Sequence, residues 1–526
     1  MNNQFQWQLP FSSLIIPAIL YGTLLGCHQV KINDGDDNIE KKESPIPEGQ
    51  EEYNQHEVAT IPEEKFSTIY EVGPGKTYPE PVDVPWESLK AGTLIKIYYR
   101  TTPYLNKWAI VGSGTPDAPI VIRGILENGK RPIISGVNAR SRGELSYPNQ
   151  NRSIIKVGES NIPKDELPDS STVDYADYYN NQINRNIMIE NLDVSGAHAS
   201  YRFYDTNGNL QSYSENAAAI HVVNGTNVTI SNCLLHNSGN GFFSGHYAAN
   251  VVMQYNSLYD NGIVSNIYHH NSYTESFGIT FQFNHYGPIK AGALGNNLKD
   301  RSNGTIVRYN FFDDGSRNLD LVDSDHSYMR NDPSYRVTFV YGNIMIKRDI
   351  SSNGQFVHYG GDGADPSIYR KGTLWFFNNT LISYRTQKNT TLFGLSSNDE
   401  RVEFFNNIVD TIAEGNRIAV AGSQGGIFNF YNNWLKAGWK TTHESSMAGV
   451  LTFSSSNLVE ISSPLTNIAA NTMDFSLKAN SSPIDSGAII PSEFSGRHSP
   501  LHEYVNEQKG KERTNDASLD MGALEF

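Results

Sequence analysis

The residues of this sequence best suited to chemistry lie between His269 and His326, where histidines, tyrosines, basic residues and carboxylates are densest. Lys299 and Arg301 stand one residue apart just before a strand-like segment, so an extended backbone places both on the same side. A lysine can accept a proton when burial and neighbouring cations favour its neutral form, and an arginine holds a carboxylate through forked hydrogen bonds. This pair therefore suits proton abstraction next to a neutralised carboxylate, followed by protonation of a leaving oxygen.

Further basic and aromatic side chains surround this pair in the sequence. Arg308 and Arg317 follow it and could hold further carboxylates. His285 and Tyr286 fall one repeat before it, and His246, with a tyrosine next to it, falls earlier still. We expect both His-Tyr pairs to line one face with the lysine, where they could protonate the leaving oxygen or stack on a sugar ring.

A second chemistry is carried by the carboxylates that crowd into the next turn, namely Asp313, Asp314, Asp320, Asp323 and Asp325. Two carboxylates on either side of a sugar support glycoside hydrolysis, one as the acid and the other as base or nucleophile. In the segment LDLVD the alternating leucines are expected to point inward, which leaves Asp320 on the outer face. Asp320 and Asp323 are then the alternative acid and base, although the same row could form ion pairs or bind calcium.

A third interpretation needs no catalysis. Aromatic side chains on a protein surface can stack on sugar rings and bind a glycan without changing it. The aromatic residues expected to be exposed are Tyr268, Tyr273, Tyr328, Trp375 and Trp434. A glycan-binding surface protein therefore stays open beside the two enzymatic interpretations.

The elements that must position these residues repeat along the chain. From residue 186 onward, segments such as NVTISNCLLHNSG and GTIVRYNFFDDG each contain an apolar strand, an asparagine and a second short strand. After the first gap, the aligned asparagines recur every 24 to 36 residues: Asn191, Asn232, Asn256, Asn284, Asn310, Asn343, Asn379, Asn407 and Asn433. Such self-similarity predicts an all-β solenoid whose inward apolar side chains stack from turn to turn. We assign these asparagines to the corners between strands, where they tolerate left-handed geometry and bond neighbouring backbone.

The segment VGPGKTY, followed by LKAGTLIKI and GSGTPDAPIVIRG, resembles the N-terminal end of the right-handed parallel β-helix superfamily that includes pectate lyases. The resemblance implies a single right-handed parallel β-helix with an N-terminal cap over residues 67–480. The later segments SSPIDSGA and NDASLDMGALEF resemble the ends of secreted β-helix proteins. Residues 481–526 are accordingly predicted to form closing turns.

The segment GNNLKDRSNGTIVRYNFF resembles β-helical lyases that act on alginate and chondroitin-type uronates. In that resemblance Lys299 takes the position of the base, and calcium becomes the one cofactor to consider. The family's calcium-binding glutamate is replaced here by the stretch 294–297, and the strand that should carry Arg-His reads NLDLVDSD. The resemblance predicts a polysaccharide lyase that cleaves a uronate-containing chain by β-elimination, with a glycoside hydrolase and a glycan-binding protein as alternatives.

The N-terminus indicates where the protein acts. An apolar run from Phe11 to Leu25 ends in Leu-Leu-Gly-Cys, which resembles the bacterial lipobox. We predict a signal peptide at 1–26, a lipidated Cys27 and a lipid anchor to the bacterial outer membrane or cell surface, with a plain secretory signal as the alternative. Residues 27–66 are predicted to be an acidic flexible tether, because 33–65 carry a net charge of -8.

Composition excludes two classes. The 526 residues carry a formal net charge of -15, and no basic footprint of a nucleic-acid binder is present. Only two cysteines occur, so no disulfide framework holds the fold. The expected partners are a polysaccharide and, through the anchor, a membrane, and we expect a monomer.

Overall fold

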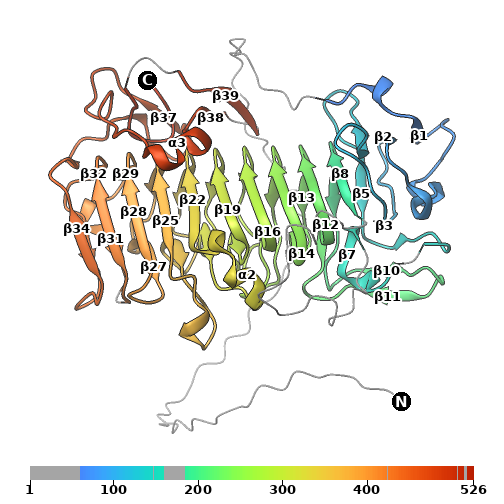
Figure 1. The fold of residues 1–526 in the computed structure, drawn as a ribbon, viewed down its shortest axis with the longest axis horizontal. Coiled ribbons are helices and arrows are strands. Elements are labelled where there is room, and N and C mark those ends of the chain that lie inside the picture. Colours follow the sequence, from blue (N-terminus) through green and yellow to red (C-terminus); the bar gives the residue numbers. More distant parts are fainter. Residues whose placement is uncertain (1–59, 146, 159–183, 423, 506–507, 515–517) are drawn as a thin grey trace, which may run out of the picture. The chain divides into compact units, whose positions relative to one another are not determined.

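The computed structural model describes residues 60–145, 147–158, 184–422, 424–505, 508–514 and 518–526. The predicted signal peptide, Cys27 and the tether up to residue 59 lie outside these residues. The described chain is built mainly of strands, with short helices between them (Figure 1). Within it, no helix combines the length and apolar character needed to span a membrane.

Successive turns of the chain pair their strands in parallel and form three rows, called faces 1, 2 and 3. Face 1 contains β3 (Trp108–Ile110), β7 (Ser153–Val157), the first parts of β12 (Ala218–Ser231), β14 (Asn240–Gln254) and β16 (Ser272–Gln282), then β18 (Leu298–Asp300), β21 (Leu319–Leu321), β24 (Gln355–Tyr359), β27 (Thr390–Leu395), β30 (Ile418–Ala421) and β33 (Lys440–Thr442). The predicted all-β, parallel β-helix is confirmed.

Faces 2 and 3 complete each turn. Face 2 contains β1 (Thr68–Val72), β2 (Thr93–Tyr98), β4 (Ile120–Ile125), β8 (Arg185–Glu190), the later parts of β12, β14 and β16, then β19 (Asn303–Arg308), β22 (Val337–Tyr341), β25 (Thr373–Phe377), β28 (Arg401–Phe405), β31 (Ile427–Tyr431) and β34 (Val450–Phe453). Face 3 contains β5 (Ile133–Ser135), β9 (Asp193–Ser195), β13 (Leu234–His236), β15 (Ser257–Tyr259), β17 (His285–Tyr286), β20 (Phe311–Asp313), β23 (Ile344–Lys347), β26 (Thr380–Ser383), β29 (Ile408–Thr411), β32 (Trp434–Lys436) and β35 (Leu458–Glu460).

The core lies between the three faces and is built from one side of each strand. Leu298, Leu319 and Val357 occupy one register row across three turns of face 1, and all are fully buried. Because side chains alternate along a strand, the residue after each of them points outward. The alternation predicted for LDLVD is therefore confirmed: Leu319 and Leu321 are buried inside, on either side of Asp320.

A ladder of buried asparagines runs along the corner between faces 2 and 3. Each side-chain amide donates to the side-chain oxygen of the asparagine one turn on, at 2.9–3.1 Å, through Asn256, Asn284, Asn310, Asn343, Asn379, Asn407, Asn433 and Asn457. The predicted alignment was one residue off for Asn191 and Asn232, which occupy the left-handed position just before the ladder, with φ of 62° and 51°. Leu192 and Cys233 hold the ladder position in those two turns, so this ladder begins at Asn256, while Asn232 Nδ2 donates to Asn191 Oδ1 at 2.7 Å in the neighbouring position.

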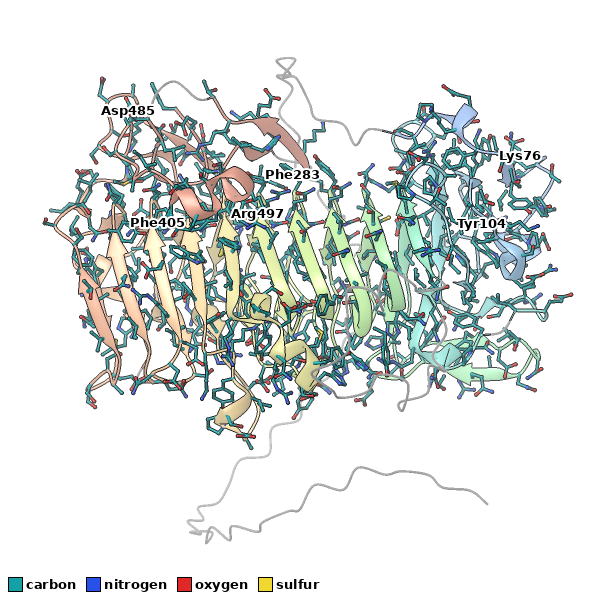
Figure 2. All side chains as sticks on the ribbon, viewed as in Figure 1. Lys76, Tyr104, Phe283, Phe405, Asp485 and Arg497 are labelled. Atoms are coloured by element: carbon teal, nitrogen blue, oxygen red, sulfur yellow. The ribbon has the colours of Figure 1, made fainter. Side chains whose placement is uncertain are left out.

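The two ends of the described chain depart from the repeat. Between β1 and β2 the chain forms two 3-10 turns, η2 (Pro81–Asp83) and η3 (Trp86–Ser88). Residues predicted as closing turns instead form the antiparallel hairpin β38 (His502–Val505) and β39 (Lys509–Glu512) and helix α3 (Ser492–His498). These pack on an outer aromatic row that includes Phe283 and Phe405, as Figure 2 shows beside Arg497 of α3. The apolar row must be covered, and the C-terminal segment covers it.

The remaining elements are short and lie outside the three faces. They are η1 (Glu63–Lys65), β6 (Ala139–Arg140), η4 (Gln150–Arg152), β10 (Arg202–Tyr204), β11 (Leu210–Ser212), α2 (Ser327–Asn331), η6 (Pro333–Arg336), η7 (Pro366–Ile368), η8 (Gly415–Arg417), β36 (Leu465–Asn467) and β37 (Asp474–Leu477). Of these, α2 and η6 follow β21, and η6 lies against β19 and β22 of face 2.

Candidate active site

Side chains from successive turns stand next to one another on the outer surface of face 1. The strand register aligns Tyr273 of β16, Lys299 of β18, Asp320 of β21 and His358 of β24. Neighbouring strands lie about 4.8 Å apart, so side chains in one register row contact each other directly. The set called the Lys299 cluster consists of these four residues together with Arg301, just after β18, and Asp362, just after β24.

Asp320 lies at the centre of the cluster, with 2% of its surface exposed. Its carboxylate is hydrogen-bonded to His358 Nδ1 at 2.7 Å and to Asn296 Nδ2 at 2.8 Å, and Lys299 and Arg317 lie 3.3 and 3.4 Å away. Burial alone would raise the pKa of Asp320, but the His358 hydrogen bond and the Lys299 charge outweigh burial and lower it. Asp320 is therefore an ionised anchor for its neighbours and not a proton donor.

Asp362 is held between the two cations of the cluster. Arg301 Nη2 lies 2.9 and 3.1 Å from its two oxygens, and Lys299 Nζ donates to one of them. The loop that carries Asp362 turns at Gly360, whose φ of 130° is one that side-chain-bearing residues rarely adopt. Burial would raise the pKa of Asp362, but Lys299 and Arg301 lower it. A carboxylate thus fits between this lysine and this arginine.

The state of Lys299 follows from these two carboxylates. Its side chain is 11% exposed. Burial would lower the pKa of Lys299, but Asp320 and Asp362 raise it above the usual value. The lowered pKa expected from the sequence is not found, because carboxylates rather than cations are its nearest neighbours. Lys299 is an ammonium ion in this arrangement.

Tyr273 joins the cluster through Arg301. The guanidinium Nε donates to the Tyr273 hydroxyl oxygen at 3.0 Å, and Nη1 donates to the backbone carbonyl of Asp323. Lys299 Nζ lies 5.8 Å from the centre of the Tyr273 ring. Because the arginine is the donor in this bond, the phenol keeps its own hydrogen for another acceptor. A proton-carrying group therefore lies between two cations.

Buried groups fix the backbone between the two cations. Asp300 is fully buried and accepts hydrogen bonds from Thr274 Oγ1 at 2.8 Å and Thr305 Oγ1 at 2.6 Å. Arg370, also fully buried, lies 3.4 Å from the Asp300 carboxylate and donates to the backbone carbonyl of Val322. Buried polar groups with several partners hold one geometry. The directions of Lys299 and Arg301 are set from inside the solenoid.

Glu275 stands one turn before Arg301, at the upstream edge of the cluster. Its Oε1 accepts a hydrogen bond from Ser324 Oγ at 2.6 Å, and His326 Nε2 lies 3.8 Å from Oε2. Burial raises the pKa of Glu275 to about 7, although Ser324 and the Arg301 charge act in the opposite direction. Glu275 was not predicted as a site residue from the sequence.

Several residues predicted for the site are brought together. Lys299, Arg301 and Asp320 belong to the cluster, and Arg317 borders it through Asp320. Asp323 lies 3.8 Å from the Arg301 guanidinium, and its carboxylate accepts a hydrogen bond from the Asp362 backbone. His246 lies at the upstream edge, with its ring next to that of His326.

Other predicted site residues lie elsewhere. His285 and Tyr286 form β17 on face 3, where Tyr286 is fully buried and stacks on Phe312 at 4.8 Å. Arg308 lies on face 2 and binds Gln282. The expectation that both His-Tyr pairs share one face is wrong, because the chain turns onto face 3 directly after the asparagine corner at Asn284.

The aromatic residues expected to be exposed are mostly covered. Trp434 is fully buried, Tyr328 is 7% exposed, and Trp375 packs on Phe494 of α3 at 4.8 Å. Tyr268 is 70% exposed. Tyr273 belongs to the cluster. The row of free aromatic surfaces that a stacking site needs is therefore not present among these five residues.

His358, Asp362 and Glu275 were missed from the sequence. A signal for His358 was present: like Lys299 and Asp320, it is a single outward polar residue between two buried ones in a short strand. Asp362 had no such signal, since its position depends on a loop that reaches back toward a lysine 63 residues earlier.

No protein-family model matches the chain, and a comparison with curated proteins found no match either. Among solved structures, an alginate lyase from Paenibacillus aligns with 71% of this chain and 95% of its own, at 10% identity and a TM-score of 0.41. The pectate lyase Pel9A aligns with 88% and 96%, at 12% identity and a TM-score of 0.40. A lacto-N-biosidase from Eubacterium ramulus aligns with 75% and 68%, at 10% identity and a TM-score of 0.41.

These likenesses carry no argument about the chemistry of this chain. The β-helix follows from its own parallel strand register, and any function must follow from its own side chains.

Proposed function

We propose that this protein is a polysaccharide-cleaving enzyme that binds a uronate-containing chain along face 1 and cleaves it by β-elimination. One observation carries the proposal: Lys299 and Arg301 hold the Asp362 carboxylate between them on the outer surface of the solenoid. A uronate carboxylate has the same charge and shape, so the same two cations can bind it when it displaces or joins Asp362. Arg317, 27% exposed, extends the positive surface by one turn.

The cluster supplies the groups that elimination needs. Neutralising the uronate carboxylate by Lys299 and Arg301 acidifies the proton on the adjacent ring carbon, C5. Tyr273 lies next to both cations, so its phenol oxygen stands beside the carboxylate that they bind. Acting as the base in its deprotonated form, Tyr273 takes the C5 proton, a C4–C5 double bond forms, and the C4–oxygen bond breaks. The same phenol then donates that proton to the leaving oxygen, which balances the step.

This assignment changes the role first predicted for Lys299. As an ammonium ion paired with two carboxylates, Lys299 serves the reaction as a cation that binds the uronate carboxylate. The base role requires a neutral lysine. The two assignments differ in whether arginine can replace it, since arginine stays charged at any working pH.

The geometry does not favour the alternatives. Hydrolysis needs one protonated carboxyl group, and the predicted pair of Asp320 and Asp323 does not suit that role, since the pKa of Asp320 is lowered and Asp323 is 1% exposed beneath Arg301. Non-catalytic binding by aromatic stacking has few exposed rings to use, as described above. Calcium is not assigned a place in the cluster.

The function is tested by a substrate panel. The full chain is incubated with alginate, pectate, a glycosaminoglycan and a neutral glucan, with and without chelator, and the ultraviolet absorbance of unsaturated uronate is followed. We expect that absorbance to appear with one or more polyuronates and not with the glucan. Saturated reducing ends alone would indicate hydrolysis, and binding without products would indicate a glycan-binding protein; either outcome overturns the proposal.

We also propose that the enzyme acts at the bacterial cell surface, as a monomer anchored through a lipidated Cys27. The anchor places the enzyme where large polymers are accessible. In the bacterial host, Cys27→Ser should move the protein from the membrane fraction to the soluble fraction. A variant that stays with the membrane fraction would contradict the anchor.

A further inference from the structure

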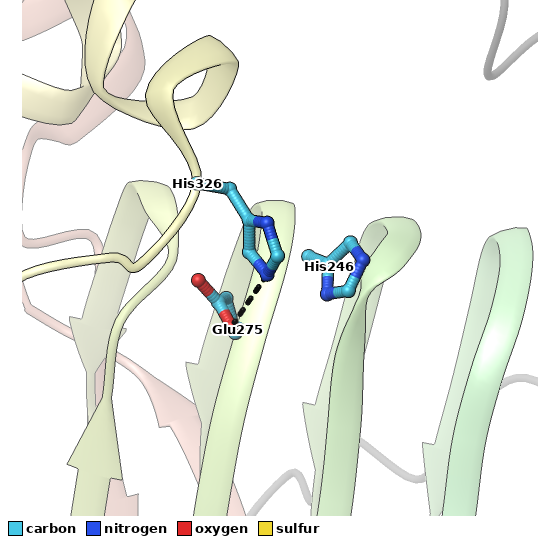
Figure 3. A group of neighbouring side chains, drawn as sticks. All are labelled: His246, Glu275 and His326. Atoms are coloured by element: carbon cyan, nitrogen blue, oxygen red, sulfur yellow. Dashed lines mark ion pairs between the residues drawn. The ribbon is translucent and has the colours of Figure 1, made fainter. Parts of the chain in front are cut away.

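Two histidines and a glutamate converge beside the upstream end of the Lys299 cluster. His246 lies in β14, Glu275 lies in β16, and His326 is the residue just before α2. The three side chains point toward one another (Figure 3). One ring nitrogen from each histidine and one carboxylate oxygen lie within 4.8 Å of one another. Three separate segments of chain thus direct metal-binding atoms toward one point.

The strands are irregular where His246 joins this group. The register of β12 and β14 shifts between Val222 and Asn224, and that of β14 and β16 shifts between Ser244 and Ala248. An extra residue in a strand redirects the local side chains, and such bulges are common next to functional sites. The irregularity lies where these strands pass from face 1 to face 2.

Direct contacts within the group are weak ones. His326 Nε2 lies 3.8 Å from Glu275 Oε2, which is longer than a hydrogen bond. The rings of His246 and His326 lie 3.6 Å apart between centroids, at an angle of 35°. Two imidazole nitrogens beside one carboxylate oxygen form a donor set that divalent transition metal ions prefer.

Surrounding groups hold these side chains in place. Ser324 Oγ donates to Glu275 Oε1 at 2.6 Å, and the backbone N–H of His326 donates to the same hydroxyl oxygen at 3.0 Å. Tyr328 Oη donates to the backbone carbonyl of His246 at 3.1 Å, and Arg330 donates to that of Ser324 at 2.7 Å. Such outer contacts orient the ligands of metal sites.

We propose that His246, Glu275 and His326 bind a divalent first-row transition metal ion, with zinc as the reference ion. Two imidazole nitrogens and one carboxylate suit zinc and its neighbours, whereas calcium and magnesium prefer all-oxygen surroundings. Three protein ligands leave at least one position for a further ligand, as in catalytic zinc sites.

The geometry needs only a small adjustment. Atoms bound to one tetrahedral zinc lie roughly 3.3 Å apart, given zinc–nitrogen distances of about 2.0 Å. The three ligand atoms, which lie within 4.8 Å of one another, must therefore approach one another by up to about 1.5 Å when the ion binds. Side-chain rotations of two histidines supply that movement, since His326 precedes α2 and His246 lies in the irregular part of β14.

The position of the ion, next to the Lys299 cluster, suggests a role in substrate binding. Glu275 stands one turn before Arg301, because the Arg301 backbone N–H donates to the Thr274 carbonyl at 2.8 Å. Turns are about 4.8 Å apart, so an ion held by Glu275 would lie about one turn upstream of Arg301. There it would bind an oxygen of the same polymer. This role of the ion in binding the polymer rests on the proposed function, but metal binding itself does not.

Metal binding is tested without substrate. The full chain, without a histidine tag, is stripped with chelator and titrated with zinc chloride by calorimetry, and the retained metal is measured by mass spectrometry. We expect one zinc ion per chain. His326→Ala and Glu275→Gln should each weaken binding by at least about 10- to 100-fold. His285→Ala, on face 3, is the matched control and should bind zinc as the wild type does.

Three results would overturn the site: no zinc retained by a folded wild-type chain, calcium chloride binding as tightly as zinc, or unchanged zinc affinity in Glu275→Gln. Circular dichroism and thermal melting of each variant check the fold, and His246→Asn replaces a variant that fails to fold. Zinc binding and lyase activity are measured separately, so the two proposals can fail independently. A chain that binds zinc but does not cleave polyuronates would support the metal site and overturn the proposed lyase function.

Discussion

Replacing Lys299 with methionine should lower kcat/KM on the responsive polyuronate by roughly 100- to 1,000-fold. Methionine keeps the length and apolar stem of the side chain but removes the ammonium that holds Asp362 and faces Asp320. In the transition state the uronate carboxylate gains negative charge, and this cation then stabilises it more than in the ground state. Initial rates of unsaturated-product formation measure the effect, mainly in kcat.

Two companion variants show what Lys299 does. Lys299→Arg keeps the charge and cannot act as a base, so it should retain activity within about 10-fold of the wild type if the residue binds the carboxylate. Equal loss in Lys299→Arg and Lys299→Met would instead assign the base to Lys299. Lys290→Met removes a lysine that pairs with Asp260 and Asn237 on the surface, away from the cluster, and its rate should be unchanged.

The Lys299→Met variant must also be shown to fold. Asp320 keeps Arg317, His358 and Asn296 as partners when Lys299 is lost, so the solenoid should remain intact. Asp362→Asn leaves both cations in place and removes the internal carboxylate, so its KM should not rise. Retained wild-type kcat/KM in a folded Lys299→Met chain would remove the cation from the mechanism.

The alternation of inward and outward side chains along each strand made part of the site predictable from sequence. Leu319 and Leu321 are apolar on either side of Asp320, and this pattern alone places the aspartate outside. The same reasoning placed Lys299 and Arg301 on one side, and both contact Asp362. The repeating asparagines predicted the solenoid because a recurring corner residue marks a recurring turn.

What failed was the assignment of residues to faces. His285 and Tyr286 follow an asparagine of the ladder directly, so they lie on face 3, whereas the site lies on face 1. Strands of two or three residues are too short for a period to identify their face. Asn191 was misaligned for a related reason, since a one-residue offset changes a ladder position into a left-handed corner.

Side-chain contacts between distant parts of the sequence could not be predicted either. Asp362 meets a lysine 63 residues earlier only because the intervening turns and loops have particular lengths. His358 reaches Asp320 across 38 residues by strand register. Loop length varies freely on the surface of a solenoid, so sequence spacing does not fix which side chains meet.

Asp320→Asn should destabilise the fold by about 3–5 kcal/mol, the usual cost of removing one partner of a buried charge pair. Lys299, Arg317 and His358 all converge on this carboxylate, which is 2% exposed. An amide cannot compensate the charges of Lys299 and Arg317, and its N–H₂ group would face donors. Urea unfolding followed by circular dichroism measures the loss as a lower transition midpoint.

The pH dependence of that loss identifies its cause. The pKa of Asp320 is lower in the folded chain than the value of about 3.9 for an unfolded aspartate, so its contribution to stability is fully present above that pH. The difference between wild type and Asp320→Asn should therefore be constant from about pH 5 to 8 and shrink as the pH falls below about 4. Asp313→Asn is the matched control: Asp313 pairs with Arg348 on face 3, where both side chains are partly exposed, and its loss should cost less than about 1 kcal/mol. A difference that grows as the pH falls would show that Asp320 does not act as an ionised anchor, and the cluster would then lose the charge that holds Lys299 as a cation.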